Sequence, residues 1–529
     1  MIETPRASRG MMTAPHHLAA QAGLAVLRDG GNAVEAMVAA AATIAVVYPH
    51  MNAIGGDGFW LIAEPGAAPV AIEACGPAAA AATPALYRAH GHAEIPARGG
   101  LAALTVAGTV SGWQLALDHA ARWGKALPRA RLLEDAIHHA RAGIAVTASQ
   151  RRYSVAKWDE LADQPGFRAV FAPTGAPPET ASRLANPALA ASLERLAAAG
   201  FDDFYRGDLA RMLAADLARA GSPLVLADLA GYRARLVAPL SLALPCGRLW
   251  NLPPPTQGLA SLMILGIFSR LEVSEADGFA HVHGLVEATK RAFAVRDRHI
   301  ADPDVMTVDP AGFLAGVALA EAAAAIDPRR AAPWGGAPAA GDTVWLGAID
   351  HAGRAVSFIQ SLYWEFGSGV VGRDSGVLWQ NRGASFRLEA GAANALAPGR
   401  RPFHTLNPAY ARLKDGRQLV YGTMGGDGQP QTQAAVFSRY ALFGQDLQRA
   451  VSAPRWLLGR TWGSPSVTLK LEARWPERLV AALTAAGHPI EMVEAHSDLV
   501  GHAGAVAQLP SGILEGASDP RSDGGVAGY

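Results

Sequence analysis

The sequence predicts an α+β fold, in which a helix-rich first half is followed by a half that begins with strands. Three observations support this. Apolar residues in the first half recur mostly at helical spacing, whereas the stretch from Thr343 onward is rich in β-branched and aromatic residues. Between the two halves, residues 317–342 lose apolar periodicity and gain Pro, Gly and Ala, which predicts a loop or tail.

The N-terminal region predicts two helices followed by a strand pair. Residues 15–28 carry apolar side chains at helical spacing and end at a Gly-rich turn, after which Asn32 is a suitable N-cap for a helix over Ala33–Val47. That helix is about 15 residues long, whereas a membrane span needs about 20, so we expect it in the protein core. The apolar runs at 59–63 and 69–73 predict paired strands.

The middle of the chain, residues 112–313, is rich in Ala, Leu and Arg and predicts mostly helix, interrupted by a stiff Pro-rich segment at 251–258. The second half predicts a strand, a turn at residues 350–353 and further strands. The four expected strands are residues 343–349, 355–364, 376–379 and 418–421.

Composition and charge limit the classes of function. The 529 residues include 46 basic and 46 acidic side chains, so the net charge is zero and nothing indicates a nucleic-acid or membrane partner. Two cysteines, Cys75 and Cys246, cannot build a disulfide scaffold. The polar N-terminus lacks the apolar core of a signal peptide, so we expect a cytoplasmic protein.

The sequence predicts no cofactor and no metal. His281 and His283 have a spacing that can bind metal on a strand, but they lie in an expected helix, residues 275–293, where the two rings point apart. The Gly-rich string at 55–58 lacks the helix and the lysine of a nucleotide-binding loop.

Thr343 has the position of a nucleophile that is released by chain cleavage. If the Asp342–Thr343 bond is cut, Thr343 gains an α-amino group, whose unperturbed pKa is roughly 7.7 to 8.0. Such an amine can accept the proton of the threonine's own hydroxyl near neutral pH. Taken alone, a threonine that follows a loop is an ordinary strand residue, so the motifs elsewhere in the chain decide between these interpretations.

Nine short motifs in order along the chain resemble the γ-glutamyltransferase family of N-terminal-nucleophile (Ntn) hydrolases. Each motif alone is an ordinary Gly-rich or Pro-rich turn, and their order and spacing carry the resemblance. They occupy residues 30–34, 55–59, 105–112, 253–258, 341–343, 366–369, 401–402, 422–426 and 516–521.

The resemblance implies an αββα four-layer fold and a precursor that cleaves itself before Thr343. Residues 1–342 would form a large subunit and residues 343–529 a small one, held together as a heterodimer that can itself pair into a dimer. The resemblance also implies catalytic roles. Thr343 matches the nucleophile, Ser361 a second hydroxyl beside it, and Gly425 and Gly426 the backbone amides of an oxyanion hole.

Two departures from the family pattern concern the substrate. Where the family reads an α-carboxylate with an arginine, this chain has Cys75 or a neighbour, and Ala384 and Ser385 stand where two aspartates read an α-ammonium. A serine pair is replaced by His404 and Thr405. A buried ammonium without a partner is costly, so γ-glutamyl donors are expected to bind poorly.

One positive charge is gained at Arg382, whose planar guanidinium suits a carboxylate. Together with the short motifs at 13–17 and 48–51, this resembles the oxamate amidohydrolase branch of the family, which acts in purine breakdown. The alternative for Arg382 is a structural role. Similarly, Asp427 contacts substrate or holds the turn, His404 binds substrate or is a core histidine, and Tyr363 walls the pocket or fills the core. The predicted substrate-binding residues are Arg382, Asn381, Tyr363, His404, Thr405 and Asp427.

The predicted function is a self-cleaving Ntn amidohydrolase that hydrolyses a small anionic amide, oxamate, through a threonyl ester. Two alternatives stay open: a γ-glutamyltransferase or glutathione hydrolase that recognises its donor differently, and a non-catalytic binding protein on the same fold. Retention of Thr343, Ser361 and the double glycine argues against the binding protein.

Self-cleavage is testable by intact mass measurement. The purified wild-type protein is expected as two fragments of 342 and 187 residues, and the Thr343→Ala variant as one uncut chain of 55.0 kDa, because the attacking hydroxyl is missing. A wild-type protein that stays at 55.0 kDa contradicts the prediction.

Overall fold

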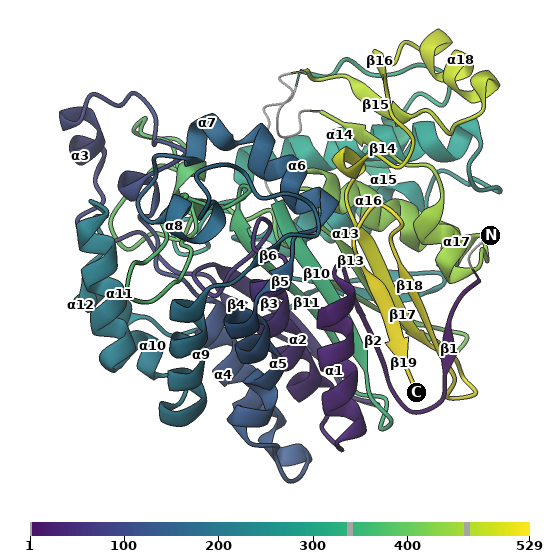
Figure 1. Ribbon diagram of the computed structural model, residues 1–529. Helices are drawn as coiled ribbons and strands as arrows, with labels where there is room; N and C mark the ends of the chain where they lie inside the picture. Colours follow the sequence, from purple (N-terminus) through teal and green to yellow (C-terminus); the bar gives the residue numbers. More distant parts are fainter. Residues whose placement is uncertain (1–2, 336–341, 460–465) are drawn as a thin grey trace.

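Two seven-stranded sheets stacked face to face form the middle of the molecule (Figure 1). The computed structural model describes residues 3–335, 342–459 and 466–529. The first sheet contains, in spatial order, β19 (Gly525–Gly528), β2 (Met11–Ala14), β10 (Asp342–Ile349), β11 (Ala355–Tyr363), β3 (Asp57–Ala63), β4 (Val70–Ala74) and β7 (Arg235–Val237). The second contains β1 (Arg6–Ala7), β18 (Leu514–Ser518), β17 (Ala503–Gln508), β13 (Gln418–Thr423), β12 (Ala409–Leu413), β9 (Gly247–Asn251) and β8 (Leu240–Leu244).

Helices cover the outer face of each sheet, which completes the four αββα layers that the family resemblance implies. The first sheet is covered by α1 (His17–Arg28), α2 (Ala33–Val47) and α4 (Thr109–Ala120), with α5 (Arg129–Ala142) and α9 (Pro187–Ala199) outside them. The second is covered by α13 (Gly258–Phe268) and α16 (Gly428–Phe437), against which α14 (Phe279–His299) packs. A small sheet of β14 (Trp456–Leu458), β15 (Leu469–Glu472) and β16 (Ile490–Val493) lies with α18 (Glu477–Ala485) at one corner (Figure 1).

The buried helix α2 has the predicted bounds because its N-terminus is fully capped. The Asn32 Oδ1 accepts the N–H groups of Val34 and Glu35 at 3.0 and 3.1 Å, and Glu35 Oε2 accepts the N–H of Asn32 at 2.9 Å. This is a capping box. Asp350, in the turn after β10, accepts the N–H of Ala33 at 3.0 Å, so the second half of the chain also helps to cap this helix.

Segments before and after Asp342 contribute strands to both sheets. In the first sheet, β10 and β11 lie between β2 and β3, with antiparallel pairing on each side. A break before Thr343 would therefore leave two pieces that share the hydrophobic core and hydrogen-bond to each other along whole strands.

Two of the predicted elements are wrong. Part of the expected tail is a helix, α15 (Gly316–Ala324), because this Ala-rich stretch packs on α13. The middle region is mostly helical, as predicted, and β8 and β9 within it join the second sheet. Residues 376–379 form only isolated bridges because Gly376, with φ +69°, turns the chain against the start of α9. The junction residues 336–341 lie outside the described residues.

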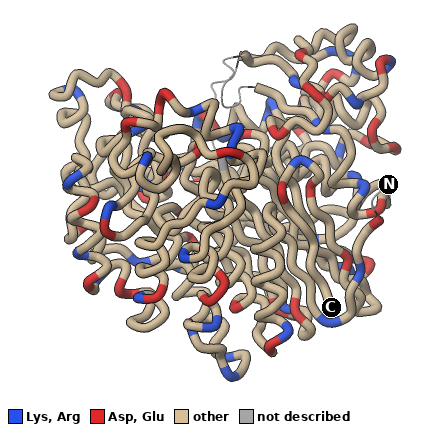
Figure 2. Tube along the Cα trace, viewed as in Figure 1, with Lys and Arg blue, Asp and Glu red and all other residues tan. Residues whose placement is uncertain are grey.

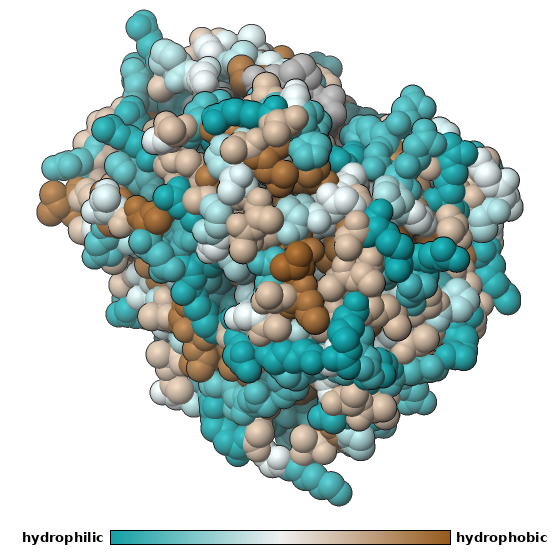
Figure 3. All heavy atoms as spheres, turned by 90° about the vertical axis from the view of Figure 1, so that its left-hand side faces the viewer, coloured by the Kyte–Doolittle hydropathy of each residue, from teal (hydrophilic) through white to brown (hydrophobic). Residues whose placement is uncertain are grey.

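Charge and apolar surface are both dispersed. Figure 2 shows acidic and basic residues of both signs spread over the outer helices and loops, with few along the central strands. The face in Figure 3 carries apolar side chains as separate patches among polar ones. In the described residues, no helix has the length and apolar character needed to cross a membrane.

Trp345 fills the space between the two sheets, and glycines on the opposite sheet make room for it. A Cβ at Gly422 would clash with the indole Cδ1, and one at Gly504 would lie 2.6 Å from Cζ3. The indole Nε1 donates to Ser357 Oγ at 2.9 Å. The glycines of the second sheet thus set how closely β13 and β17 approach β10.

Gly422→Ala is expected to lower the free energy of unfolding by about 1–3 kcal/mol, because the added methyl overpacks the sheet interface at Trp345. Thermal unfolding measures this. Gly312→Ala is the matched control, since a Cβ at Gly312 meets no atom within 4 Å. Equal melting temperatures for the two variants would contradict the packing role of Gly422.

Candidate active site

Thr343 and Ser361, predicted as a catalytic pair, lie side by side on neighbouring strands. The Thr343 Oγ1 donates to Ser361 Oγ at 3.3 Å, and the same Ser361 oxygen accepts the backbone N–H of Tyr363 at 2.8 Å. Thr343 is only 1% exposed and Ser361 only 3%. The nucleophile expected from the sequence is therefore held in the interior, next to a second hydroxyl.

The pairing of β10 with β11 is irregular at this point. Asp342 is opposite Tyr363, but Val344 is opposite Gln360, so two residues of β11 face Thr343. Such a bulge locally re-aims side chains and is frequent beside active sites. Tyr363 itself has φ +87°, a left-handed conformation that is strained for a residue with a Cβ.

Arg382 is the centre of the predicted substrate-binding residues. It begins the short 3₁₀ turn η4 (Arg382–Ser385), is 1% exposed, and places its guanidinium carbon 3.9 Å from the ring centroid of Tyr363. Its Nη2 donates to Thr405 Oγ1 at 2.9 Å, whereas Nη1 has no hydrogen-bond partner among the described residues. The structure thus brings Tyr363, Arg382 and Thr405 together.

The charge of Arg382 is not neutralised by an ion pair. No carboxylate of the described residues lies within 4.0 Å of the guanidinium. Burial lowers the pKa of Arg382 from its ordinary value, and the nearby Tyr363 opposes this shift. A guanidinium stays protonated at neutral pH under such shifts. The site therefore holds a buried cation with one unused donor.

Asn381 precedes Arg382, but both ends of its amide are occupied. Its Oδ1 accepts the N–H of Trp364 at 3.1 Å, and its Nδ2 donates to the carbonyl of Ala97 at 2.8 Å. These bonds fasten the Arg382 turn to the end of β11. In this arrangement Asn381 orients Arg382 rather than offering a free group to a ligand.

Gly425 and Gly426 follow β13 in a turn that glycine favours. Their φ values are +119° and +52°. In the part of the chain that the structure describes, neither amide N–H donates a hydrogen bond. Because Trp345 packs at Gly422 and Gly347 at Val420, the start of β10 and the end of β13 lie at the same end of the stacked sheets.

Gln257 connects the double glycine to the Arg382 side of the site. Its Nε2 donates to the carbonyls of Gly426 and Thr405 at 2.8 and 2.7 Å, and its Oε1 accepts from Arg296 at 2.8 Å. Sequence reasoning quoted residues 253–258 as a motif but gave Gln257 no role. The signal available was a polar amide at the start of an otherwise apolar helix, α13.

Asp427, predicted to contact substrate or to hold the turn, is paired with Arg296. Arg296 Nη1 and Nη2 lie 3.0 and 3.3 Å from the two carboxylate oxygens, and both side chains are buried. This buried ion pair supports the turn-holding interpretation, since it anchors the residue next to Gly426 to α14.

Asp57 is a charged site residue that sequence reasoning missed. It begins β3, lies directly opposite Ser361 in the ladder with β11, and is fully buried. Its Oδ2 lies 3.3 Å from Nε2 of His404, a predicted substrate-binding residue. The available signal was an aspartate at the entry to a strand whose other residues are apolar.

One group of described side chains has the chemistry of a metal site but is already satisfied. Ligand atoms of His283, Glu287 and His488 lie within 4.8 Å of one another. The Glu287 carboxylate accepts from Lys290 Nζ at 2.6 Å and from the N–H of Ala332 at 3.2 Å, and the two histidines hydrogen-bond to each other at 2.8 Å. We interpret the cluster as structural, because the lysine supplies the positive charge that a metal would bring.

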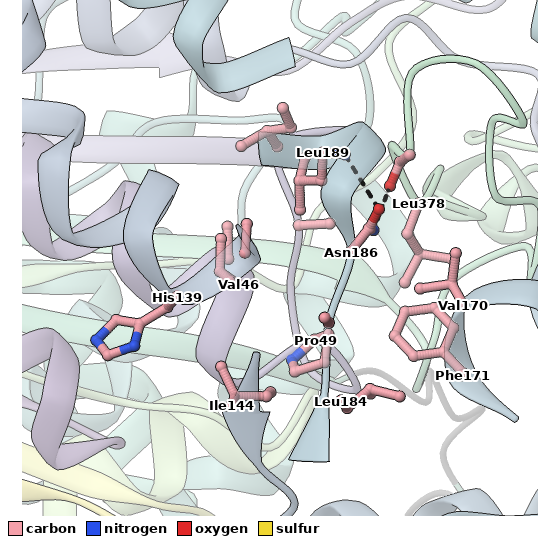
Figure 4. Close-up of a pocket in the computed structure, with 16 residues that line it drawn as sticks. Val46, Pro49, His139, Ile144, Val170, Phe171, Leu184, Asn186, Leu189 and Leu378 are labelled. Carbon is pink, nitrogen blue, oxygen red and sulfur yellow. Dashed lines mark hydrogen bonds between the residues drawn. The ribbon is translucent and has the colours of Figure 1, made fainter. Parts of the chain in front are cut away.

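The apolar cavity in Figure 4 is a packing void. Its volume is about 30 Å³, enough for one water molecule. Asn186 at its edge is satisfied, accepting the N–H of Leu189 at 3.0 Å and donating to the carbonyl of Gly376 at 2.9 Å. The other side chains labelled around it are largely apolar: Val46, Pro49, His139, Ile144, Val170, Phe171, Leu184, Leu189 and Leu378.

A larger groove of about 620 Å³ is lined by Cys75, which, or a neighbour of which, is expected from the sequence to stand in the arginine position of the family pattern. Three arginines line this groove: Arg235 and Arg401 lie 3.0 and 3.3 Å from Glu73, and Arg233 is exposed. Burial raises the pKa of the Cys75 thiol well above its ordinary value, so it is neutral.

Comparison with known proteins gives one family for nearly the whole chain. Residues 19–529 match the family model described as gamma-glutamyltranspeptidase. The chain is 57% identical over 523 residues to a protein of Klebsiella pneumoniae subsp. pneumoniae named oxamate amidohydrolase proenzyme, covering 99% of both chains. It is 30% identical over 556 residues to the glutathione hydrolase proenzyme of Escherichia coli, covering 99% of this chain and 92% of that protein.

Solved structures support the same family assignment. The cephalosporin acylase of Bacillus halodurans superposes with a TM-score of 0.91 at 32% identity, covering 100% of this chain and 97% of that one. A gamma-glutamyltranspeptidase from Pseudomonas nitroreducens, complexed with L-DON, gives a TM-score of 0.55 at 30% identity, covering 60% of this chain and 95% of that one.

Asp427→Ala is expected to lower the free energy of unfolding by about 1.5–3 kcal/mol, because it removes one buried charged partner of Arg296, which keeps Asp297 and Gln257 as partners. Glu194→Ala, which breaks an exposed pair with Arg141, is the control and should cost less than about 1 kcal/mol. Denaturant unfolding distinguishes them. A loss at Asp427 no larger than at Glu194 would show that the pair does not anchor the turn.

Proposed function

The chain belongs to the gamma-glutamyltranspeptidase family of Ntn hydrolases and is an enzyme, and from this we propose that it is a self-cleaving amidohydrolase that converts oxamate to oxalate and ammonia. The observation that carries the substrate assignment is Arg382. It is a buried guanidinium with no carboxylate partner among the described residues and one unused donor, connected by contacts through Tyr363 and Ser361 to Thr343.

Maturation uses the same hydroxyl as catalysis. The Thr343 Oγ attacks the carbonyl carbon of Asp342, the peptide C–N bond breaks, and the acyl group moves to oxygen as an ester. Water then hydrolyses the ester, which leaves Asp342 as a C-terminal carboxylate and Thr343 with a free α-amine. Ser361, at 3.3 Å, is placed to orient the hydroxyl during this step. The word proenzyme in the names of the relatives supports processing.

Hydrolysis then proceeds in two steps. The free amine of Thr343 accepts the proton of Oγ, which attacks the amide carbon of the substrate; the amine returns the proton to the leaving nitrogen, and ammonia departs. Water, deprotonated by the same amine, attacks the threonyl ester and releases the acid. The amides of Gly425 and Gly426, which donate to no described residue and lie at the end of the sheets where β10 begins, fit the role of stabilising the oxyanion in both steps.

Arg382 suits the carboxylate that oxamate carries next to its amide carbon. A guanidinium binds a carboxylate through two parallel N–H donors, and a charge-assisted hydrogen bond is stronger when it is buried. In oxamate the carboxylate and the scissile carbonyl are adjacent, so the substrate fits an arginine close to the nucleophile. Tyr363 and Thr405 hold the guanidinium in place from two sides.

A γ-glutamyl donor is less well matched. It presents a zwitterionic end, with an ammonium that needs a carboxylate partner. Of the described acidic residues in the site, Asp427 pairs with Arg296 and Asp57 is bonded to backbone and amide donors. An assay with both kinds of substrate therefore distinguishes this alternative function, γ-glutamyl transfer or glutathione hydrolysis, from oxamate hydrolysis.

Arg382→Gln is expected to lower kcat/KM for oxamate by about a hundredfold or more, equivalent to about 2.7 kcal/mol, because the carboxylate loses its cation. The neutral analogue oxamide is the matched substrate and should lose less than about threefold, since it has no carboxylate to bind. Ammonia release measures both.

The wild-type protein is assayed in parallel for release of a chromogenic amine from a γ-glutamyl anilide. Turnover of the anilide without turnover of oxamate would replace the proposal by the γ-glutamyl alternative. Absence of turnover with either substrate, together with an uncut chain, would favour the non-catalytic binding protein.

A further inference from the structure

Asp57 and His404 form a second buried unit beside Arg382. His404 is next in the chain to Thr405, which accepts a hydrogen bond from Arg382, and Asp57 is opposite Ser361 in the sheet. Both side chains are fully or almost fully buried, with exposures of 0% and 1%. The pair thus lies between Ser361, the neighbour of the nucleophile, and the buried cation Arg382.

The Asp57 carboxylate is satisfied at one oxygen only. Its Oδ1 accepts three donors, the N–H groups of Gly76 and Gly108 at 3.2 and 3.0 Å and Nε2 of Gln380 at 3.1 Å. Its Oδ2 accepts no hydrogen bond from the described residues and lies 3.3 Å from His404 Nε2. The three donors fix the carboxylate in place, so the second oxygen can change its protonation without moving.

His404 is held by its backbone, and its ring is not otherwise bonded. Its N–H donates to the carbonyl of Pro255 at 2.8 Å, and its carbonyl accepts the N–H of Gln257 at 3.0 Å. Neither ring nitrogen has a hydrogen-bond partner among the described residues, and the ring meets Phe59 edge-on at 4.9 Å. Asp57 Oδ2 and His404 Nε2 therefore lie 3.3 Å apart, and neither has a hydrogen-bond partner among the described residues.

We infer that Asp57 and His404 are a positioning and specificity pair for anionic substrates, which takes up one proton when a carboxylate binds to Arg382. The inference rests on the proposed function, in which Arg382 receives that carboxylate. Asp57 acts through Arg382 and His404, so it is a positioning residue rather than a catalytic one.

The electrostatic environment of Asp57 and His404 allows this proton uptake at neutral pH. Burial raises the pKa of Asp57 to about 7, against the lowering effect of its hydrogen bonds and of Arg382. Burial, aided by Arg382, holds the pKa of His404 well below its ordinary value, so the ring is neutral.

Three further titratable groups interact with Asp57: Cys75, Tyr205 and Tyr232. Burial raises their pKa values, so they are uncharged at neutral pH. Arg382 is the charged group that shifts the pKa of both Asp57 and His404.

The direction of the coupling follows from these charges. In the free enzyme, Arg382 stabilises the ionised form of Asp57. A carboxylate bound to Arg382 cancels that stabilisation and adds a negative charge, so the pKa of Asp57 rises further and the protonated form prevails. Below about pH 6 the free enzyme is already protonated and no uptake occurs; from about pH 7 upward, uptake accompanies binding and affinity falls as pH rises.

Calorimetric titration of the processed enzyme with oxalate, at pH 7.5 in buffers of different ionisation enthalpy, tests the inference. The wild type should take up about 0.5 to 0.9 proton per oxalate, and its Kd should rise about threefold to fivefold between pH 7 and pH 8. In the Asp57→Asn variant, the proton uptake per oxalate should fall by at least about half a proton, and most of the pH dependence of Kd should disappear. Asp415→Asn, a change at an exposed carboxylate, should behave as wild type.

The free amine of Thr343 also titrates near neutral pH, so a second measurement identifies the group. An infrared difference spectrum of the wild type should show a protonated carboxyl band that appears on adding oxalate. Because this measurement uses the wild type, it also tests the inference if the Asp57→Asn variant fails to fold.

Three outcomes are distinct. Uptake that depends on Asp57, or the carboxyl band, supports the inference. Oxalate binding and oxamate turnover without either signal overturn it and leave the proposed function in place. Absence of both oxalate binding and oxamate turnover overturns the proposed function, and this inference with it.

Discussion

The antiparallel pairing of β10 with β11 is the constraint on which the site depends. It sets Thr343 against Ser361, and its one-residue shift places the strained Tyr363 at the end of the ladder, where its ring supports Arg382. The next strand, β3, places Asp57 opposite Ser361 by the same kind of main-chain register. Nucleophile, second hydroxyl and buried acid thus come from three adjacent central strands, the cation from the turn η4 that packs on Tyr363, and β13 of the other sheet brings the double glycine to the same end.

The site contains several buried polar atoms without hydrogen-bond partners among the described residues, in contrast to the fully capped N-terminus of α2. The N-terminus of α2 satisfies its donors with Asn32, Glu35 and Asp350. In the site, by contrast, one donor of Arg382, one oxygen of Asp57 and both ring nitrogens of His404 are buried without hydrogen-bond partners among the described residues. Buried polar groups are rarely left unpaired, because each costs free energy. In the site these atoms lie on and around Arg382, where a polar ligand would supply partners; other buried polar atoms without hydrogen-bond partners, such as those of Gln150 and His502, lie elsewhere among the described residues.

Local signals made part of this structure predictable. The helix Ala33–Val47 has the predicted bounds because a cap and an apolar run define it, and β10 and β11 were visible as apolar β-rich runs around a turn. The resemblance to a family supplied Thr343, Ser361 and the glycines.

The missed features depend on distant parts of the chain. Strand register sets the bulge at Thr343. Contacts across 148 to 347 positions set the partner of Asp57 and the bridge made by Gln257. The helix α15 was mistaken for a tail because its alanines show little periodicity until they meet α13. Asn381 looked like a binding residue because the sequence does not show that both ends of its amide are occupied.

The sheet that contains Thr343 also joins the two ends of the chain. β2, which pairs with β10, starts at Met11, and its other neighbour is β19, which ends at Gly528. The strand β2, the direct neighbour of the strand that carries the nucleophile, is therefore paired on both sides only when β19 has added to the sheet. Under the proposed self-cleavage, docking of β19 would thus support the cut from two strands away: without Gly525–Gly528, β2 would be an edge strand, paired with β10 alone.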